Sequence, residues 1–223
     1  MPEFWEKSKG RGLETVAFWR RLHPLLRVGG TSPDAHAEGV ARLEPLAQAV
    51  TDARAVLRAA KRAEWAAFAE IRALNLSVPL LLAGRFAKGH PVRSALGAVF
   101  ALVPRSDALN LQRARRLIAV WRSANRAVAA RKAGDGIVRD EVGLAEFIRM
   151  VGEYPQLGQA TADAELEFHA ARTILRTQHR KVDRLNKRAY LKFKAETCGN
   201  APLREALANA ITREKPSASR RRK

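Results

Sequence analysis

Apolar residues recur along this chain with the spacing of a helix face rather than the alternation of a strand. Between residues 43 and 74 they follow a heptad repeat. One core position holds Leu43, Val50, Leu57, Glu64 and Ile71, and the other holds Leu46, Ala53, Ala60, Ala67 and Leu74. A period of about 3.5 residues predicts a helix whose inner face packs on a neighbour, and the row of alanines predicts a close approach.

Glu64 is the misfit in this repeat. It is either a buried polar residue with a partner, or it marks a place where the packed face rotates toward Trp65 and Phe68. We favour the rotation, because a charged side chain is seldom buried without a partner.

The start of the first long helix is marked by a capping sequence. Ser32 can accept hydrogen bonds from free amides, Pro33 suits the first helical position, and Asp34 favours the positive end of the helix dipole. Pro45 lacks an amide donor, so it predicts a kink or the true start of this helix. We expect the helix to cover residues 33–75.

Two further long helices are predicted at 106–133, with Ser106 as its cap, and at 161–196. Their apolar faces hold Ala114, Leu117, Trp121, Ala124 and Val128 in the first, and Phe168, Ala171, Leu175, Val182, Ala189 and Phe193 in the second. Prolines and glycines after residue 75 predict that the chain leaves the first helix there. Short helices are expected within the first thirty residues and at 92–103, 142–151 and 202–212, with a loop at Tyr154-Pro155.

These elements predict an all-α protein, an antiparallel helical bundle with three long helices plus shorter helices. The expected domain organisation is an N-terminal short helix and turn at 1–30, a helical bundle domain at 31–212, and a basic disordered tail at 213–223.

Composition agrees with this class and points to a cytoplasmic protein. The hydrophobic fraction is 47% with only 6% aromatic residues, and the single cysteine, Cys198, excludes an internal disulfide. The N-terminus lacks the pattern of a secretory signal. Charges and prolines interrupt the most apolar stretch, at 76–103, so we predict no transmembrane segment.

Charge is the strongest indication of a partner. Lys and Arg number 41 against 22 Asp and Glu, a net charge of +19, and the isoelectric point is near 11.3. Such a balance predicts attraction to polyanions such as nucleic acid, anionic lipid or an acidic protein.

The basic residues form a ladder in the last long helix. At strict four-residue spacing stand Arg172, Arg176, Arg180, Arg184, Arg188 and Lys192. Neighbours four apart repel one another on a helix, by about 0.2 to 0.5 kcal/mol per contact. Something must therefore compensate for five successive like-charge contacts.

Two compensating partners are possible for this ladder. Residues 135–171 carry eight acids and two arginines, a net charge of −6, and can fold against the ladder as an ion-pair network. Alternatively the ladder follows a phosphate backbone, since the planar guanidinium can donate two hydrogen bonds to one phosphate. We expect the outward cluster to be Arg180, Arg184, Lys187 and Arg188, with Tyr190 as an aromatic neighbour.

Asn186 shares the helical phase of the apolar residues Phe168 and Val182. A buried amide can fix the register of packed helices, so an internal hydrogen bond is the favoured role over a binding-site role.

Motifs of catalysis are missing from the sequence. The five histidines form no His-Glu-x-x-His or paired Glu-x-x-His pattern, and no phosphate-binding loop or nucleophile elbow is present. Gly10-Arg11-Gly12 is interpreted as a turn. We therefore predict no enzyme activity, cofactor, metal or small-molecule substrate.

The sequence favours a non-enzymatic binding or scaffold protein that associates with polyanions, most readily nucleic acid with little sequence specificity. The residues predicted to bind it are Arg176, Arg180, Arg184, Lys187, Arg188, Lys192, Arg220, Arg221 and Arg222. The alternative is a structural or assembly protein that joins a protein partner or other copies through its long helices. A membrane-active helical bundle is the third possibility.

Overall fold

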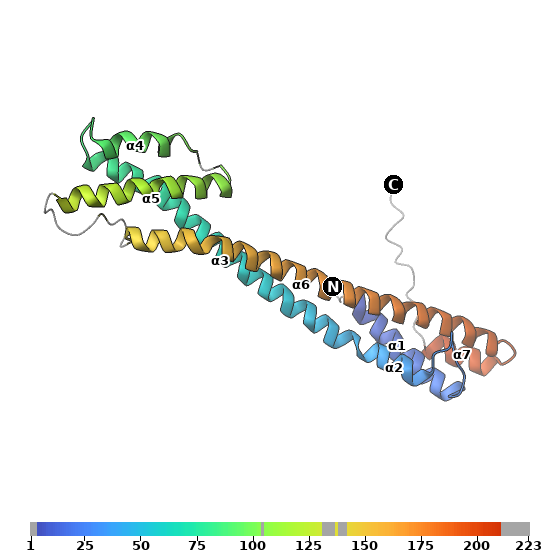
Figure 1. The fold of residues 1–223 in the computed structure, drawn as a ribbon. Helices are drawn as coiled ribbons and strands as arrows, with labels where there is room; N and C mark the ends of the chain where they lie inside the picture. The colour runs from blue at the N-terminus through green and yellow to red at the C-terminus, as the bar shows by residue number, and fades with distance from the viewer. Residues whose placement is uncertain (1–3, 104, 131–136, 138–141, 211–223) are drawn as a thin grey trace, which may run out of the picture. The chain divides into compact units, whose positions relative to one another are not determined.

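A computed structural model describes residues 4–103, 105–130, 137 and 142–210 (Figure 1). These residues form the helices α1 (Phe4–Leu22), α2 (Pro33–Ala41), α3 (Leu43–Arg85), α4 (Pro91–Phe100), α5 (Asp107–Ala130), α6 (Leu144–Glu196) and α7 (Ala201–Ala210). Within the described ranges there is no strand, and Val28 and Thr31 form an isolated bridge. The all-α class is confirmed, and the antiparallel bundle of three long helices stays a prediction.

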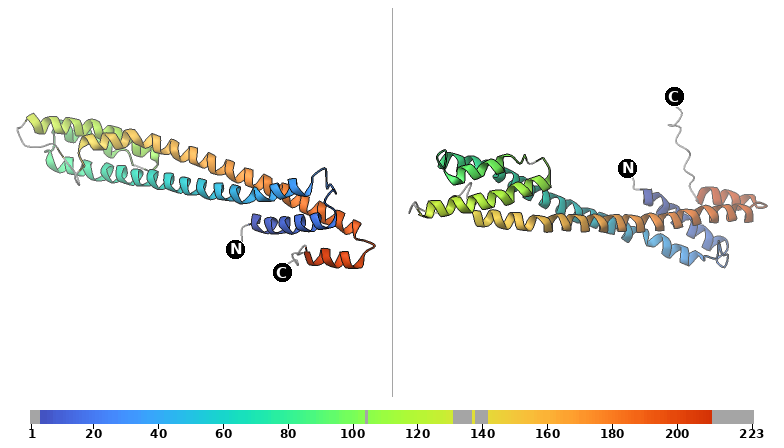
Figure 2. Two further views of the ribbon diagram at one scale, coloured as in Figure 1. Left: turned by 90° about the horizontal axis from the view of Figure 1, so that it is seen from below. Right: turned by 45° about the horizontal axis from the view of Figure 1, so that its top comes forward.

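The chain divides into two compact units, and both α3 and α6 contribute to each. Unit 1 combines residues 1–54 with 166–223, and unit 2 comprises residues 55–165. Within each unit, the segments of α3 and α6 lie side by side in every view (Figures 1 and 2). The predicted domain boundaries at 30 and 212 stay predictions, and the predicted tail at 213–223 lies outside the described residues.

Unit 1 is built on two small apolar clusters. In one, Phe18 and Trp19 of α1 pack against Phe193 of α6, with ring centroids 5.4 and 5.7 Å from that of Phe193. In the other, Leu43 and its neighbours on α3 pack with Leu175 and Val182 of α6, among others. The inner face of the C-terminal half of α6 is therefore occupied by packing within unit 1.

The N-terminal connections of unit 1 follow from a few local residues. Gly29 and Gly30 both have positive φ angles, 59° and 80°, and form a tight turn in which Val28 and Thr31 exchange backbone hydrogen bonds. The predicted cap is confirmed, because Ser32 Oγ accepts from the Ala35 amide at 3.2 Å. The prediction of a turn around Gly12 is wrong: Gly12 lies inside α1, and a Cβ there would clash with Val40 of α2. The close packing of α1 on α2 therefore explains why a glycine stands at position 12.

A buried polar network also holds unit 1 together. Asn186 on α6 is 6% exposed, and its Oδ1 accepts from His36 Nε2 at 2.7 Å. Its Nδ2 donates to the Ser8 carbonyl at 3.3 Å, so one amide joins α1, α2 and α6. The predicted internal hydrogen bond of Asn186 is confirmed. Burial lowers the pKa of His36, and the hydrogen bond to Asn186 only partly opposes this effect.

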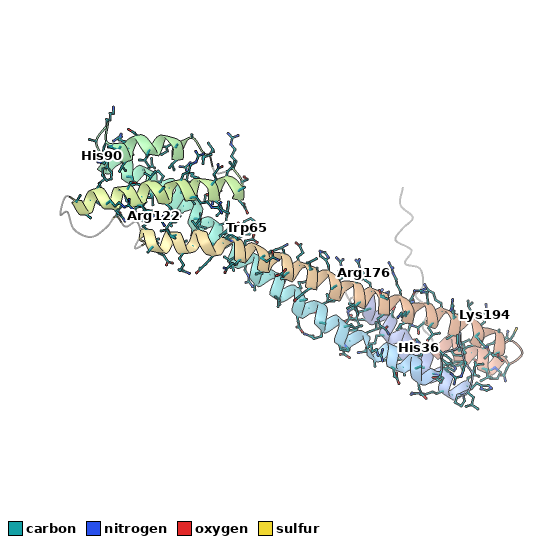
Figure 3. All side chains as sticks on the ribbon, viewed as in Figure 1. His36, Trp65, His90, Arg122, Arg176 and Lys194 are labelled. Atoms are coloured by element: carbon teal, nitrogen blue, oxygen red, sulfur yellow. The ribbon has the colours of Figure 1, made fainter. Side chains whose placement is uncertain are left out.

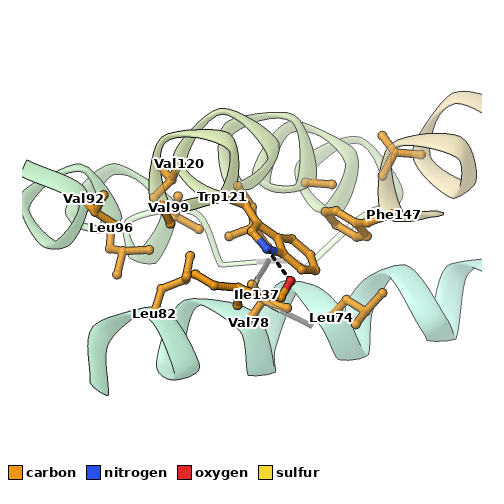
Figure 4. Packing of buried hydrophobic residues seen from close by; sticks show 14 of the residues in the cluster. Leu74, Val78, Leu82, Val92, Leu96, Val99, Val120, Trp121, Ile137 and Phe147 are labelled. Carbon is orange, nitrogen blue, oxygen red and sulfur yellow. Dashed lines mark hydrogen bonds between the residues drawn. The ribbon is translucent and has the colours of Figure 1, made fainter. Parts of the chain in front are cut away.

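Unit 2 has the larger core. Leu74, Val78 and Leu82 of α3 pack against α4 and α5, and Phe147 closes the cluster from α6 (Figure 4). Trp121 lies at the centre, fully buried, and its indole N–H donates to the Ile137 carbonyl at 3.1 Å.

Three prolines test the predicted helix ends, and their outcomes differ. Pro45 cannot donate to the carbonyl of Ala41, and the helix is interrupted there, with α2 ending at Ala41 and α3 starting at Leu43. The predicted breaks at residue 75 and at Tyr154-Pro155 are wrong, because α3 continues through Pro79 to Arg85 and α6 runs unbroken through Pro155. Packing in the larger core outweighs the local preference at these two sites.

Arg113 explains how α3 tolerates Pro79. A proline at position 79 deprives the Asn75 carbonyl of its usual helical donor. Arg113 of α5, only 5% exposed, supplies a replacement, since its Nε donates to that carbonyl at 3.1 Å. Its Nη1 donates to the Leu102 carbonyl at 2.6 Å. One buried arginine thus satisfies two carbonyls that the local helix geometry leaves open.

The heptad of α3 does face inward. All ten of its positions are buried or half-buried, including Glu64. The interpretation that the packed face rotates toward Trp65 is wrong, because Trp65 is 79% exposed, while Phe68 does pack against the core of unit 2.

The substitution Arg113→Met is expected to lower the free energy of unfolding by about 3 kcal/mol, because two interior carbonyls lose their donors. In a Pro79→Ala background, residue 79 regains an amide for the Asn75 carbonyl, so the same substitution should cost about 1 kcal/mol less. Denaturant unfolding of the four proteins measures this coupling. Equal costs in both backgrounds would show that Arg113 does not compensate for Pro79.

The pKa of His36 predicts a pH dependence of stability. Because this pKa is lowered on folding from 6.5, the unfolded chain binds more protons, and stability is complete above pH 6.5 and falls as the pH decreases toward the folded pKa. The slope should not exceed about 1.4 kcal/mol per pH unit for one proton. Unfolding free energies between pH 8 and 5 should show a shallower slope for His36→Gln than for the unchanged protein. Parallel curves would contradict the assignment.

Candidate polyanion-binding face

The C-terminal half of α6 has two opposite faces. Leu175, Val182, Ala189 and Phe193 are buried against the rest of unit 1. At about 100° per residue, the side diametrically opposite these positions holds Arg180 and Arg184. The inner face is therefore fixed by packing, and the basic residues point outward.

Every described residue predicted to bind polyanion is exposed to solvent: Arg176, Arg180, Arg184, Lys187, Arg188 and Lys192. Arg172 and Lys194 are exposed as well, and Figure 3 marks Arg176 and Lys194 on α6. The predicted residues Arg220, Arg221 and Arg222 lie outside the described part of the chain.

Only part of the ladder faces one direction. Four-residue steps drift by about 40° each around a helix, so Arg172 and Lys192 turn toward the edges of the buried face. We call the central outward group the α6 basic face, and it consists of Arg176, Arg180, Arg184, Lys187 and Arg188. From Arg176 to Arg188 it extends about 18 Å along the helix axis.

The arginines of this face have no acidic partner among the described residues. Arg176, Arg180, Arg184 and Arg188 make no ion pair there. Arg184 Nε donates to the Arg180 carbonyl at 3.2 Å, which orders the side chain without neutralising it. Lys187 differs, because its Nζ lies 2.8 Å from a carboxylate oxygen of Asp183.

The acidic interval pairs elsewhere, as far as it is described. Glu146 and Glu153 both bind Arg149 on their own helix, and Glu165 lies 3.4 Å from Lys61. The ion-pair network between this interval and the ladder, one of the two compensations that the sequence allows, is therefore not formed by these residues. Asp135, Asp140 and Glu141 lie outside the described ranges.

Tyr190 does not join the outward group. Its side chain is half-buried and packs against the cluster of Trp19 and Phe193. The nearest described cation–π contact on this part of α6 involves Arg54, whose guanidinium lies 5.6 Å from the centre of the Phe168 ring. The basic face therefore consists of guanidinium and ammonium groups, without an outward aromatic platform for stacking.

A second set of exposed arginines lies in unit 2, on α5. Arg115, Arg122 and Arg126 are exposed, as the helix phase predicts, and make no described ion pair. Other arginines of unit 2 are structural, since Arg93 donates to the carbonyls at the end of α3 and Arg116 donates to the Ala98 carbonyl. The arginines of unit 2 are thus of two kinds: some are exposed and make no described ion pair, and others donate hydrogen bonds to backbone carbonyls.

The described part of the chain contains no group of three or more His, Cys, Asp or Glu side chains arranged to hold a metal ion. By length and composition alone, one helical stretch within Pro33–Arg85 could cross a membrane, with a mean hydropathy of 1.4 over 18 residues, of which 33% are buried. The absence of a transmembrane segment therefore stays a prediction.

Comparisons with protein-family models, with curated proteins and with solved structures find no match to this chain.

One surface of unit 2 is not predicted by the sequence. In unit 2, Glu64 and Trp65 of α3 line a groove together with Asp107 of α5 and Tyr154 of α6. The available signal was the unusual position of Glu64 in the heptad next to a tryptophan. Its partners come from distant helices, so the sequence alone could not assemble the groove.

If the ladder is unpaired, removing its central charge should stabilise the fold. Arg184→Gln abolishes two like-charge contacts, with Arg180 and Arg188, each about 0.2 to 0.5 kcal/mol. Thermal unfolding should show a higher Tm at low salt, and the gain should vanish at about 1 M salt, where charges are screened within roughly 3 Å. Lys187→Gln, which removes a paired cation from the same helix, is the control and should give no gain. A loss of stability for Arg184→Gln would reveal an acidic partner.

Proposed function

We propose that the α6 basic face binds a polyanion, and that this polyanion is nucleic acid held with little sequence specificity. The protein acts in this proposal as a non-enzymatic binding or scaffold protein of the cytoplasm. The observation that carries it is the group of exposed arginines at four-residue spacing that lack acidic partners among the described residues.

A bound polyanion would compensate for the repulsion between the arginines of the α6 basic face. A helix that keeps Arg176, Arg180, Arg184 and Arg188 on its outer side bears their mutual repulsion in the free state. A phosphate backbone removes that repulsion, because each guanidinium can donate two parallel hydrogen bonds to phosphate oxygens. Binding therefore gains both the new contacts and relief from the old repulsion.

The dimensions of the face suit a nucleic acid duplex. Along about 18 Å of helix axis, a duplex presents on the order of ten phosphate charges, since it carries one per about 1.7 Å. Contacts to phosphate position a protein without reading bases, and no base-reading motif accompanies the ladder in the sequence. Little sequence specificity is the expected consequence.

Binding to a short duplex and to a single strand, measured between about 50 and 200 mM salt, tests the proposal. Neutralising roughly six phosphates of duplex predicts a log–log slope near −5 and a loss of about a thousandfold in affinity over this range. The triple substitution Arg180→Gln, Arg184→Gln and Arg188→Gln should make the slope shallower by about 2.7.

The matched control removes the same charge from the other unit, by Arg115→Gln, Arg122→Gln and Arg126→Gln on α5. This control should leave the slope unchanged, because its arginines are equally exposed but lie outside the α6 basic face. Equal effects of the two triples would mean that only total charge matters, and absence of binding at 50 mM salt would refute the proposal.

An assembly role through the long helices remains the alternative. It is favoured by large apolar side chains that α6 leaves exposed, among them Leu166 at 70% and Leu191 at 64%. Sedimentation of the same samples separates the two roles, because assembly raises the mass with protein concentration in the absence of nucleic acid. We also propose that the long helices pack in an antiparallel bundle.

A further inference from the structure

Unit 2 carries a groove whose chemistry is opposite to that of the α6 basic face. Its volume is about 570 Å³, within the range of sites for small ligands. Its lining includes Glu64, Trp65, Phe68 and Arg72 from α3, Asp107 from α5 and Tyr154 from α6. All of these residues belong to unit 2, so the groove is complete within one compact unit.

Aromatic rings form one component of the groove. Phe68 and Tyr154 contact each other, with ring centroids 6.2 Å apart and planes inclined by 42°. Trp65 lines the same groove but is 79% exposed, on the helix where Figure 3 marks it. Trp19 and Trp121, in contrast, are fully buried. The exposed indole of Trp65 therefore leaves one side of this aromatic groove open to a ligand.

Carboxylates form the second component. The Tyr154 hydroxyl donates to Asp107 Oδ2 at 2.8 Å, which holds that carboxylate at the groove. Glu64 is half-buried and makes no hydrogen bond or ion pair with any described residue. Burial raises the pKa of Tyr154, and the hydrogen bond to Asp107 and the charges of Asp107 and Glu64 raise it further.

The remaining lining residues determine how charge and apolar surface are distributed along the groove. Arg72 stands two turns beyond Glu64 on α3, about 12 Å along the axis, and makes no described hydrogen bond or ion pair. Leu76, 46% exposed, extends the apolar lining. The end near Glu64 therefore combines negative charge with aromatic rings.

We propose that this groove binds a small organic cation, with its ammonium group beside Glu64 and the rings of Trp65 and Tyr154, and its apolar body toward Leu76. The face of an aromatic ring attracts a cation through its quadrupole, and tryptophan does so most strongly. The Glu64 carboxylate, which makes no ion pair with any described residue, adds a charge of the required sign. An anionic ligand meets Glu64 and Asp107 instead, and a neutral one leaves the Glu64 carboxylate uncompensated.

The test uses three probes that share one ring and differ in charge: benzyltrimethylammonium, benzyl alcohol and benzoate. Binding is followed through the indole N–H resonance of Trp65 in the full-length protein labelled with ¹⁵N-tryptophan, assigned by its loss in Trp65→Phe. Benzyltrimethylammonium should shift this resonance saturably, and the neutral and anionic probes should not. Equal shifts by all three probes would overturn the proposal.

Two charge variants are expected to change the affinity for benzyltrimethylammonium in opposite directions. At about 10 mM salt, where charges are screened over roughly 30 Å, Glu64→Gln should weaken binding of benzyltrimethylammonium by about tenfold. Arg72→Gln should strengthen it by about threefold under the same conditions, because a like charge is removed. Glu70→Gln is the control, since Glu70 is exposed on the same helix outside the groove and should leave the affinity unchanged.

The pair of variants keeps the test independent of folding defects. If Glu64→Gln unfolds the protein, as circular dichroism would show, the increase expected for Arg72→Gln still decides the matter. Identical affinities for Arg72→Gln, Glu70→Gln and the unchanged protein would refute a cation site governed by these charges.

Discussion

Continuity of the backbone hydrogen bonds in α3 and α6 is the constraint on which both units depend. Each unit takes one segment of each helix as the surface on which its shorter helices pack. A break at Pro79 would change the phase of Val78 and Leu82, which fill the core of unit 2. Arg113 prevents this by supplying the donor that proline lacks. The energetic reason is the high cost of an interior carbonyl without a partner.

Pro45 has the opposite outcome, because the carbonyl that it leaves without a donor is exposed. Its orphan carbonyl belongs to Ala41, an exposed residue for which water is an adequate partner. No buried donor is needed, and the helix is simply interrupted at Arg42. At Pro45 and Pro79, the two different outcomes thus accompany two different surroundings of the carbonyl four residues earlier.

This dependence marks how far the sequence can predict the fold. The helical class, the Ser32 cap and the inner face of α3 follow from local spacing, and all are observed. The continuation of α3 through Pro79 depends on an arginine more than thirty residues away, which local spacing cannot reveal. The buried amide of Asn186 was foreseeable from its helical phase, but its partners His36 and Ser8 were not.

The sequence is equally limited in predicting which arginines are available for binding. Arg113 and Arg93 donate to carbonyls inside unit 2, whereas Arg180 and Arg184 face solvent. A sequence count treats them alike, because the residue type is the same and only the tertiary partner differs. The four-residue spacing of the ladder was informative because it keeps several charges on a helix surface, where no single acid can neutralise them all.

Net charge is likewise a poor guide to each individual surface. In physiological salt, exposed charges act over about 8 Å, so the sign of a site is set by its immediate neighbours and not by a total of +19. On the α6 basic face the neighbours are cations, and they favour an anionic partner. In the groove the nearest groups are Glu64, Asp107 and three aromatic rings, and Arg72 stands two turns away. A strongly basic chain can therefore offer a site for a cation where carboxylates and aromatic rings outnumber the arginines that line it.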